Sequence, residues 1–198
     1  MSHCITIDGQ KITKHLGRSD WKFIVPGSGV VPKIGFASCN GDAKKLPKEL
    51  SSEQFVMWKR LLEMHKKEDE DSEPFPYAFH ALLLGGDQVY ADTMWSTVPY
   101  LAKRLFIRWR RSRFVRKHRL SAHNRQLLRE QLEQFYEDLY LQTFGQPDVC
   151  EALASIPSCM IWDDHDFVDG WGSYPESIQK SDIFKEVFEV AHRYFELF

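Results

Sequence analysis

Cysteine and long apolar runs are both scarce in this sequence. Only four of the 198 residues are cysteines, and none of them forms a Cys-x-x-Cys pair, which excludes a disulfide framework. No apolar run approaches the roughly 20 residues that cross a bilayer. The N-terminus also lacks a basic start followed by an apolar stretch. From these absences we expect no membrane span and a reducing, cytoplasmic location.

Acidic residues are absent from one long stretch of the chain. The whole sequence has 28 Asp and Glu against 26 Lys and Arg, yet eleven bases and no acid lie between Thr93 and Arg129. Aromatic residues stand among the bases of segment 103–119, a pattern that suits nucleic-acid binding or the steering of an anionic substrate. A solvated helix whose aromatic side chains pack inward explains the same pattern and is favoured over a nucleic-acid partner.

The remaining composition is that of a folded chain. Hydrophobic residues make up 43% of the sequence and charged residues 27%, which excludes a disordered tail. Two short β-prone runs near the N-terminus, ITIDGQKI and WKFIV, are expected to form a hairpin or edge strands. Three further β-prone runs, within KIGFASCNGD, YAFHALLLGGD and SCMIWDDHD, alternate with helical patterns over 51–67, 100–118, 121–144, 148–155 and 181–198. This alternation predicts an α/β fold with a mainly buried sheet flanked by helices. A basic, helical insertion is expected over about residues 93–144.

The helical pattern over residues 51–67 shows a clear periodicity. Its apolar side is formed by Phe55, Trp58, Leu62 and His65. Ser51 and Ser52 are expected to cap the start of this helix.

Potential metal ligands follow each of the three β-prone runs. Cys39 follows the first, Asp87 the second, and Asp163, Asp164 and His165 the third. Such strand ends are where α/β folds build their sites. Cys39 alone is better explained as a small buried side chain. The run 162–166 is different, because three carboxylates around a histidine repel one another and a cation would relieve that repulsion. We therefore predict a metal site at this edge.

Three motifs carry a resemblance to a known family. FASCNG, LLLGGDQVYAD and IWDDHDFVDGW resemble the motifs of PhoD-like metallophosphatases, a branch of the calcineurin-like phosphoesterase superfamily. They occur in the family's order and span the chain from Phe36 to Trp171. The resemblance implies part of a calcineurin-like α/β sandwich, with residues 1–198 forming a single, incomplete domain. It also implies metal-dependent hydrolysis of phosphate mono- or diesters by a PhoD-like alkaline phosphatase or phosphodiesterase.

The resemblance also implies a ligand set. Cys39 and Tyr90 would ligate iron, and Asp87 would bridge two metals. Asp164 would hold the second metal, which is calcium in the branch's type, with magnesium, manganese or zinc as other divalent choices. Asp163 is either a ligand or an outer contact. Thiolate and phenolate donors suit iron and carboxylates suit calcium or magnesium, so the mixed ligands are chemically consistent with mixed metals.

His165 completes the expected site. By the same resemblance His165 would act on the leaving group beside Asp164, which gives a catalytic pair. Asp92, five residues after Asp87, is expected to cap the next segment rather than bind metal.

The late part of the superfamily pattern is missing. The superfamily completes its site with further histidines, whereas only His192 follows His165 here. We therefore expect a chain truncated at its C-terminus, with impaired metal binding or activity. A nucleic-acid-binding module and a catalytically inactive scaffold are the alternative functions, and the oligomeric state is open.

Overall fold

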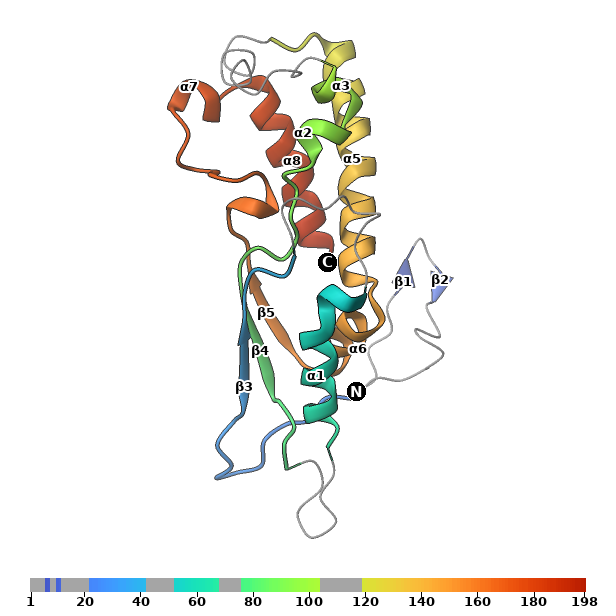
Figure 1. The fold of residues 1–198 in the computed structure, drawn as a ribbon, viewed down its shortest axis with the longest axis vertical. Helices are drawn as coiled ribbons and strands as arrows, with labels where there is room; N and C mark the ends of the chain where they lie inside the picture. Colours follow the sequence, from blue (N-terminus) through green and yellow to red (C-terminus); the bar gives the residue numbers. More distant parts are fainter. Residues whose placement is uncertain (1–5, 8–9, 12–21, 42–51, 68–75, 104–118) are drawn as a thin grey trace.

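The computed structural model describes residues 6–7, 10–11, 22–41, 52–67, 76–103 and 119–198. The strands are β1 (Thr6–Ile7), β2 (Gln10–Lys11), β3 (Ile34–Ala37), β4 (Ala81–Gly85) and β5 (Ser158–Ile161). The helices are the 3-10 helices η2 (Ser52–Phe55) and η4 (Asp164–Asp166), and the α-helices α1 (Val56–His65), α2 (Met94–Thr97), α3 (Pro99–Ala102), α5 (Ala122–Phe144), α6 (Pro147–Ser155), α7 (Glu176–Gln179) and α8 (Asp182–Leu197). The predicted α/β class is confirmed (Figure 1). No helix in these described ranges is both long and apolar enough to cross a membrane.

Three parallel strands form the sheet on which the site is built. Their order is β3-β4-β5, with Phe36 opposite Leu83 and Leu83 opposite Cys159. Because the strands are parallel, the three segments that follow them leave from one edge of the sheet. β1 and β2 pair separately as an antiparallel hairpin. This hairpin lies within the first predicted run, ITIDGQKI, and the described residues of the second run, 22–25, form no strand.

The periodicity of residues 51–67 is confirmed by α1 and the turn before it. Phe55, Trp58, Leu62 and His65 are all buried. The expected serine cap is not tested, because Ser51 lies outside the described residues. The α-helix α1 itself begins at Val56, with Phe55 at its N-cap and no side-chain cap bond. The 3-10 turn η2 takes up the residues that the pattern had assigned to the first helical turn.

Only one face of the sheet is buried, so the prediction of a mainly buried sheet is wrong for the described residues. Figure 1 shows α1 and α6 on the same side of the sheet, and Leu82 and Leu84 of β4 are buried. The opposite face is apolar but exposed: Ile34 55%, Phe36 75%, Leu83 43% and Ile161 60%. A run that is apolar on both faces is typical of a parallel strand covered on both sides. An apolar run of this kind therefore predicts that both faces of the sheet are apolar. It does not show that this chain covers both faces.

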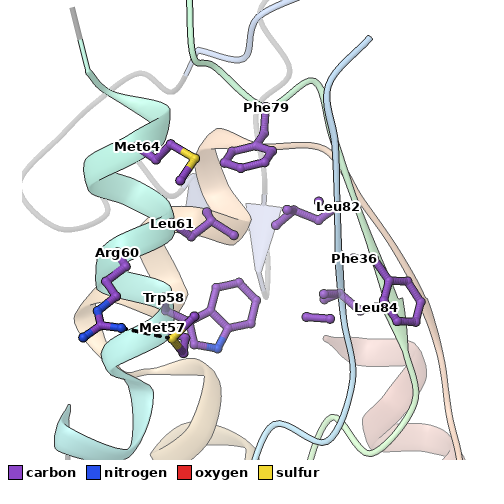
Figure 2. A pocket seen from close by; sticks show the side chains of 11 residues that line it. Phe36, Met57, Trp58, Arg60, Leu61, Met64, Phe79, Leu82 and Leu84 are labelled. Carbon is purple, nitrogen blue, oxygen red and sulfur yellow. Dashed lines mark hydrogen bonds between the residues drawn. The ribbon is translucent and has the colours of Figure 1, made fainter.

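Packing under α1 is also incomplete. A pocket of about 440 Å³ lies between α1 and the strands β3 and β4. Figure 2 shows Met57, Leu61 and Met64 of α1 on one side of it, facing Phe79 and Leu82. The sheet is thus only partly enclosed around β3, its edge strand among the described strands.

The helices α5 and α8 lie side by side (Figure 1). Ion pairs between them account for some of the bases in the stretch from Thr93 to Arg129. Each helix starts within one residue of its predicted beginning, and the side chain of Ser121 or Ser181 caps it. Arg125 and Arg129 of α5 both bind Glu186 of α8, whose side chain has no exposed surface. Three bases of the stretch, counting Arg119, therefore neutralise acids of α8.

The middle of the basic stretch lies outside the described residues. The helix expected over 100–118 begins with α3, but residues 104–118 lie outside the described part of the chain. The favoured solvated helix and the alternative, nucleic-acid binding through this segment, therefore both stay untested. The helices expected over 121–144 and 148–155 are confirmed as α5 and α6.

Replacing Glu186 with alanine should lower the free energy of unfolding by about 2–3 kcal/mol, because Arg125 and Arg129 lose a buried shared acceptor. Urea denaturation of both chains measures the loss. The matched control is Glu176→Ala, which removes the exposed partner of Lys180 and should change stability by less than about 0.5 kcal/mol. Equal losses in the two variants would contradict a stabilising role for the buried carboxylate.

Candidate metal centre

The ends of β3 and β4 are joined by backbone hydrogen bonds. Cys39 N–H donates to the carbonyl of Gly86 (3.1 Å) and Asn40 N–H to the carbonyl of Asp87 (2.8 Å). Cys39 and Asp87 both have left-handed backbone conformations, with φ of 61° and 52°. Residues other than glycine rarely adopt this region, and such strain collects at functional sites where the surroundings hold it in place.

Two further contacts hold the Cys39 loop. The indole N–H of Trp58 on α1 donates to the side-chain oxygen of Asn40 (2.7 Å). Gly41 lies so close to the ring of Tyr90 that a Cβ at this position would be 2.6 Å from Tyr90 Cδ2. The loop after β3 is thus packed against both α1 and the segment after β4.

Gly86 allows the ends of β4 and β5 to approach each other. Its φ of +109° is one that side chains rarely permit, and a Cβ on Gly86 would lie 2.7 Å from Cβ of Asp163. The close approach brings the segment after Asp87 beside the segment that carries Asp164 and His165.

Asp166 is buried and links these two segments by hydrogen bonds. Its carboxylate is 2% exposed and accepts hydrogen bonds from the backbone N–H groups of Val89 (2.9 Å) and Asp163 (2.8 Å). Burial raises the pKa of Asp166 to about 6, although these backbone donors lower it. Among the three carboxylates of the run 162–166, Asp166 therefore has a structural role, because it joins the segment after β4 to the segment after β5.

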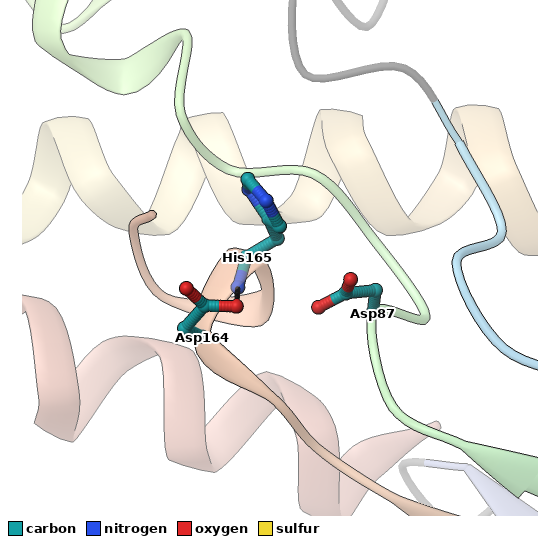
Figure 3. A group of neighbouring side chains, drawn as sticks. All are labelled: Asp87, Asp164 and His165. Atoms are coloured by element: carbon teal, nitrogen blue, oxygen red, sulfur yellow. Dashed lines mark hydrogen bonds between the residues drawn. The ribbon is translucent and has the colours of Figure 1, made fainter. Parts of the chain in front are cut away.

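Asp87, Asp164 and His165 come together at the sheet edge. Each offers one potential ligand atom, and these atoms all lie within 4.8 Å of one another (Figure 3). The Asp164 carboxylate accepts hydrogen bonds from the backbone N–H groups of His165 (3.1 Å) and Gly170 (2.6 Å), which fix its orientation. The group has the donor types and the spacing of a metal site.

Cys39 and Tyr90 both contact one oxygen of Asp87. The thiol of Cys39 and the hydroxyl of Tyr90 each lie 3.4 Å from Asp87 Oδ2. The other oxygen, Oδ1, is buried and has no hydrogen-bond partner. Because buried polar atoms are nearly always paired, this orphaned oxygen fits a cation as its missing partner.

The electrostatic surroundings of Tyr90 are also compatible with a cation at this site. Burial, the hydrogen bond with Cys39 and the negative charge of Asp87 all raise the pKa of Tyr90 far above its usual value. The phenol therefore keeps its proton in the protein alone, and a nearby cation would be needed to stabilise the phenolate.

Asp163 is placed differently from the other predicted ligands. It is exposed, caps η4, and accepts a hydrogen bond from Asp164 N–H (2.8 Å). It is not among the ligand atoms that gather within 4.8 Å. Of the two sequence alternatives, ligand or outer contact, this geometry favours the outer contact.

Asp92 has a role that the sequence interpretation missed. Asp92 Oδ2 lies 2.7 Å from Nδ1 of His165. The cap of α2 is Thr93, so the prediction of Asp92 as a helix cap is wrong. The two partners are 73 residues apart, and no local spacing reveals their pairing.

The pKa of His165 reflects this contact. Burial lowers it, but the hydrogen bond and charge of Asp92, followed by the charges of Asp164 and Asp87, outweigh burial and leave the pKa raised. The imidazole is therefore tied to a carboxylate that is separate from the Asp87 group.

Comparison with known proteins now identifies the family. Residues 7–198 match the profile of the family described as PhoD related phosphatase. The chain belongs to this family. It is also 30% identical over 192 residues to a protein from Saccharomyces cerevisiae, the uncharacterized protein YGR266W, covering 90% of this chain and 25% of the yeast protein. This PhoD-related chain thus spans about a quarter of its relative's length. No solved structure matches it.

Gly86→Ala should destabilise the chain by at least about 1 kcal/mol more than Gly172→Ala. Both glycines have positive φ, but only at Gly86 would the new Cβ meet a neighbour, Asp163, whereas nothing lies within 4 Å of Gly172. Thermal unfolding of the two variants measures the difference. Equal stability would show that the close approach of β4 and β5 does not depend on the missing side chain.

Proposed function

We propose that this chain carries the metal-binding part of a phosphatase that hydrolyses phosphate mono- or diesters. One observation carries the proposal: Cys39, Tyr90 and a buried, unpartnered oxygen all meet at Asp87, beside Asp164 and His165. Membership of the PhoD-related family supports the reaction class. Because the chain spans about a quarter of its yeast relative, the activity of the whole protein is part of the proposal.

The donors divide into two chemical sets that suit different metals. The thiol of Cys39 and the phenol of Tyr90 lie on the side of Asp87 Oδ2 and suit iron. The carboxylate of Asp164 suits calcium or another divalent cation. Asp87 contributes to both sets and is the bridging ligand in this proposal. Bound cations would neutralise phosphate oxygens and lower the pKa of a coordinated water.

In this proposal, Asp164 binds in a fixed orientation and His165 transfers a proton. Asp164 is held by two backbone N–H donors, so its carboxylate meets a ligand in one preset orientation. His165, next to Asp164 and 23% exposed in its side chain, is accessible to an ester and can transfer a proton to the departing oxygen.

We further propose that the sheet is one half of a calcineurin-like sandwich and that residues 1–198 form part of a single domain. The exposed apolar side chains of Phe36, Leu83 and Ile161 support this, because a second layer packed on them would bury the face. The partly open pocket beside β3 is consistent with a sheet that continues beyond the described strands.

The proposal predicts that Asp87→Asn lowers phosphatase or phosphodiesterase activity by at least about 100-fold, because one carboxylate serves both metals. Hydrolysis of p-nitrophenyl phosphate and bis(p-nitrophenyl) phosphate by iron- and calcium-loaded chains measures the effect. Activity that is indifferent to the substitution would contradict the proposed site.

Metal content gives a test that does not require activity. Cys39→Ser should reduce bound iron, measured by elemental analysis, because a hydroxyl is a poorer ligand than a thiolate for this metal. Cys159→Ser is the matched control, since Cys159 is exposed on β5 and outside the ligand group, and should retain wild-type iron. Iron that is lost equally from both variants, or never bound by the wild type, would count against the centre.

A further inference from the structure

Asp92, an acid outside the proposed ligand set, holds His165 at one ring nitrogen. Asp92 Oδ2 lies 2.7 Å from His165 Nδ1, and Asp92 Oδ1 accepts a hydrogen bond from Asp169 N–H at 2.9 Å. Both carboxylate oxygens are therefore engaged. Rotation of the Asp92 carboxylate would break at least one of these bonds.

Contacts from the segment after β4 also restrain His165. The ring of Tyr90 lies against the imidazole, with ring centroids 4.6 Å apart and planes inclined by 30°. The backbone N–H of Ala91 donates to the carbonyl of His165 (2.9 Å). Backbone, ring face and Nδ1 of His165 are thus all fixed by residues 90–92.

The hydrogen-bond chemistry assigns roles to the two ring nitrogens. An aspartate carboxylate is an acceptor only, so the short contact places a hydrogen on Nδ1 of His165. The partner of one ring nitrogen determines which nitrogen is free for chemistry. Here that nitrogen is Nε2.

We propose that Asp92 is a positioning residue for His165, an inference that rests on the proposed phosphatase function. By keeping the hydrogen on Nδ1, Asp92 makes Nε2 the nitrogen that exchanges a proton with the ester. The donor is His165 with a hydrogen on each ring nitrogen. Its Nε2–H bond breaks, the electron pair stays on Nε2, and an O–H bond forms on the departing oxygen, which leaves a neutral imidazole with its hydrogen on Nδ1. Asp92 neither gains nor loses a proton in this step.

Asp92→Asn tests the role because its amide must choose an orientation. The amide oxygen is needed by Asp169 N–H, so the NH₂ group turns toward His165 Nδ1 and requires that nitrogen to be an acceptor. In ¹⁵N NMR spectra of the chain without added metal, the hydrogen of neutral His165 should be on Nδ1 in the wild type and on Nε2 in the variant. The same tautomer in both chains would overturn the proposal, whether or not the chain is active.

Kinetics separates positioning from a merely structural effect. In the metal-loaded chain, Asp92→Asn should lower kcat by about 10–100-fold and change KM by less than about threefold. Because Asp92 acts through His165, the double variant Asp92→Asn/His165→Ala should be no slower than His165→Ala alone. Losses that multiply in the double variant would show that Asp92 acts independently and would overturn the proposal.

A control of the same chemistry is available on α6. Asp148→Asn removes one acidic charge in the first turn of that helix and should leave both the His165 tautomer and kcat unchanged. If this control alters kcat as much as Asp92→Asn, a general charge effect replaces the positioning role. A wild-type chain that binds neither iron nor calcium would refute the proposed function, while the NMR comparison would still decide how Asp92 holds His165.

Discussion

The parallel alignment of β3, β4 and β5 is the constraint on which the candidate site depends. In this arrangement the segments that follow all three strands leave from one edge, although Cys39 and Asp164 are far apart in sequence. Gly86 then permits the last two segments to approach, and buried Asp166 ties them together through backbone hydrogen bonds. The ligands are thus carried by short, strongly held loops, as a precise metal site requires.

Electrostatics gives this edge its chemical character. Asp87 is 7% exposed and has an orphaned oxygen, and the Asp164 carboxylate lies nearby. Cys39 and Asp87 are also held in left-handed backbone conformations. Strain and the proximity of two carboxylates both oppose stability, and a bound cation would relieve the second of these. Elsewhere in the described chain, arginines of α5 neutralise the buried acid of α8 directly.

Local sequence patterns predicted much of this arrangement. The three β-prone runs placed Cys39, Asp87 and Asp164 at strand ends, and the expected α/β fold placed those ends at one edge of the sheet. The pairing of Asp92 with His165 could not be predicted, since it joins residues distant in sequence and Asp92 has the local pattern of a helix cap. Burial of the sheet was overestimated at Phe36 and Ile161 because apolar periodicity does not show whether a covering layer exists.

The most direct test of the account is X-ray absorption spectroscopy at the iron edge of the metal-loaded chain, with Cys39→Ser for comparison. The account predicts one sulfur ligand among oxygen and nitrogen ligands in the wild type, and its disappearance in the variant. An iron environment with only oxygen and nitrogen ligands, identical in both proteins, would contradict the convergence of Cys39, Asp87 and Tyr90 on a metal.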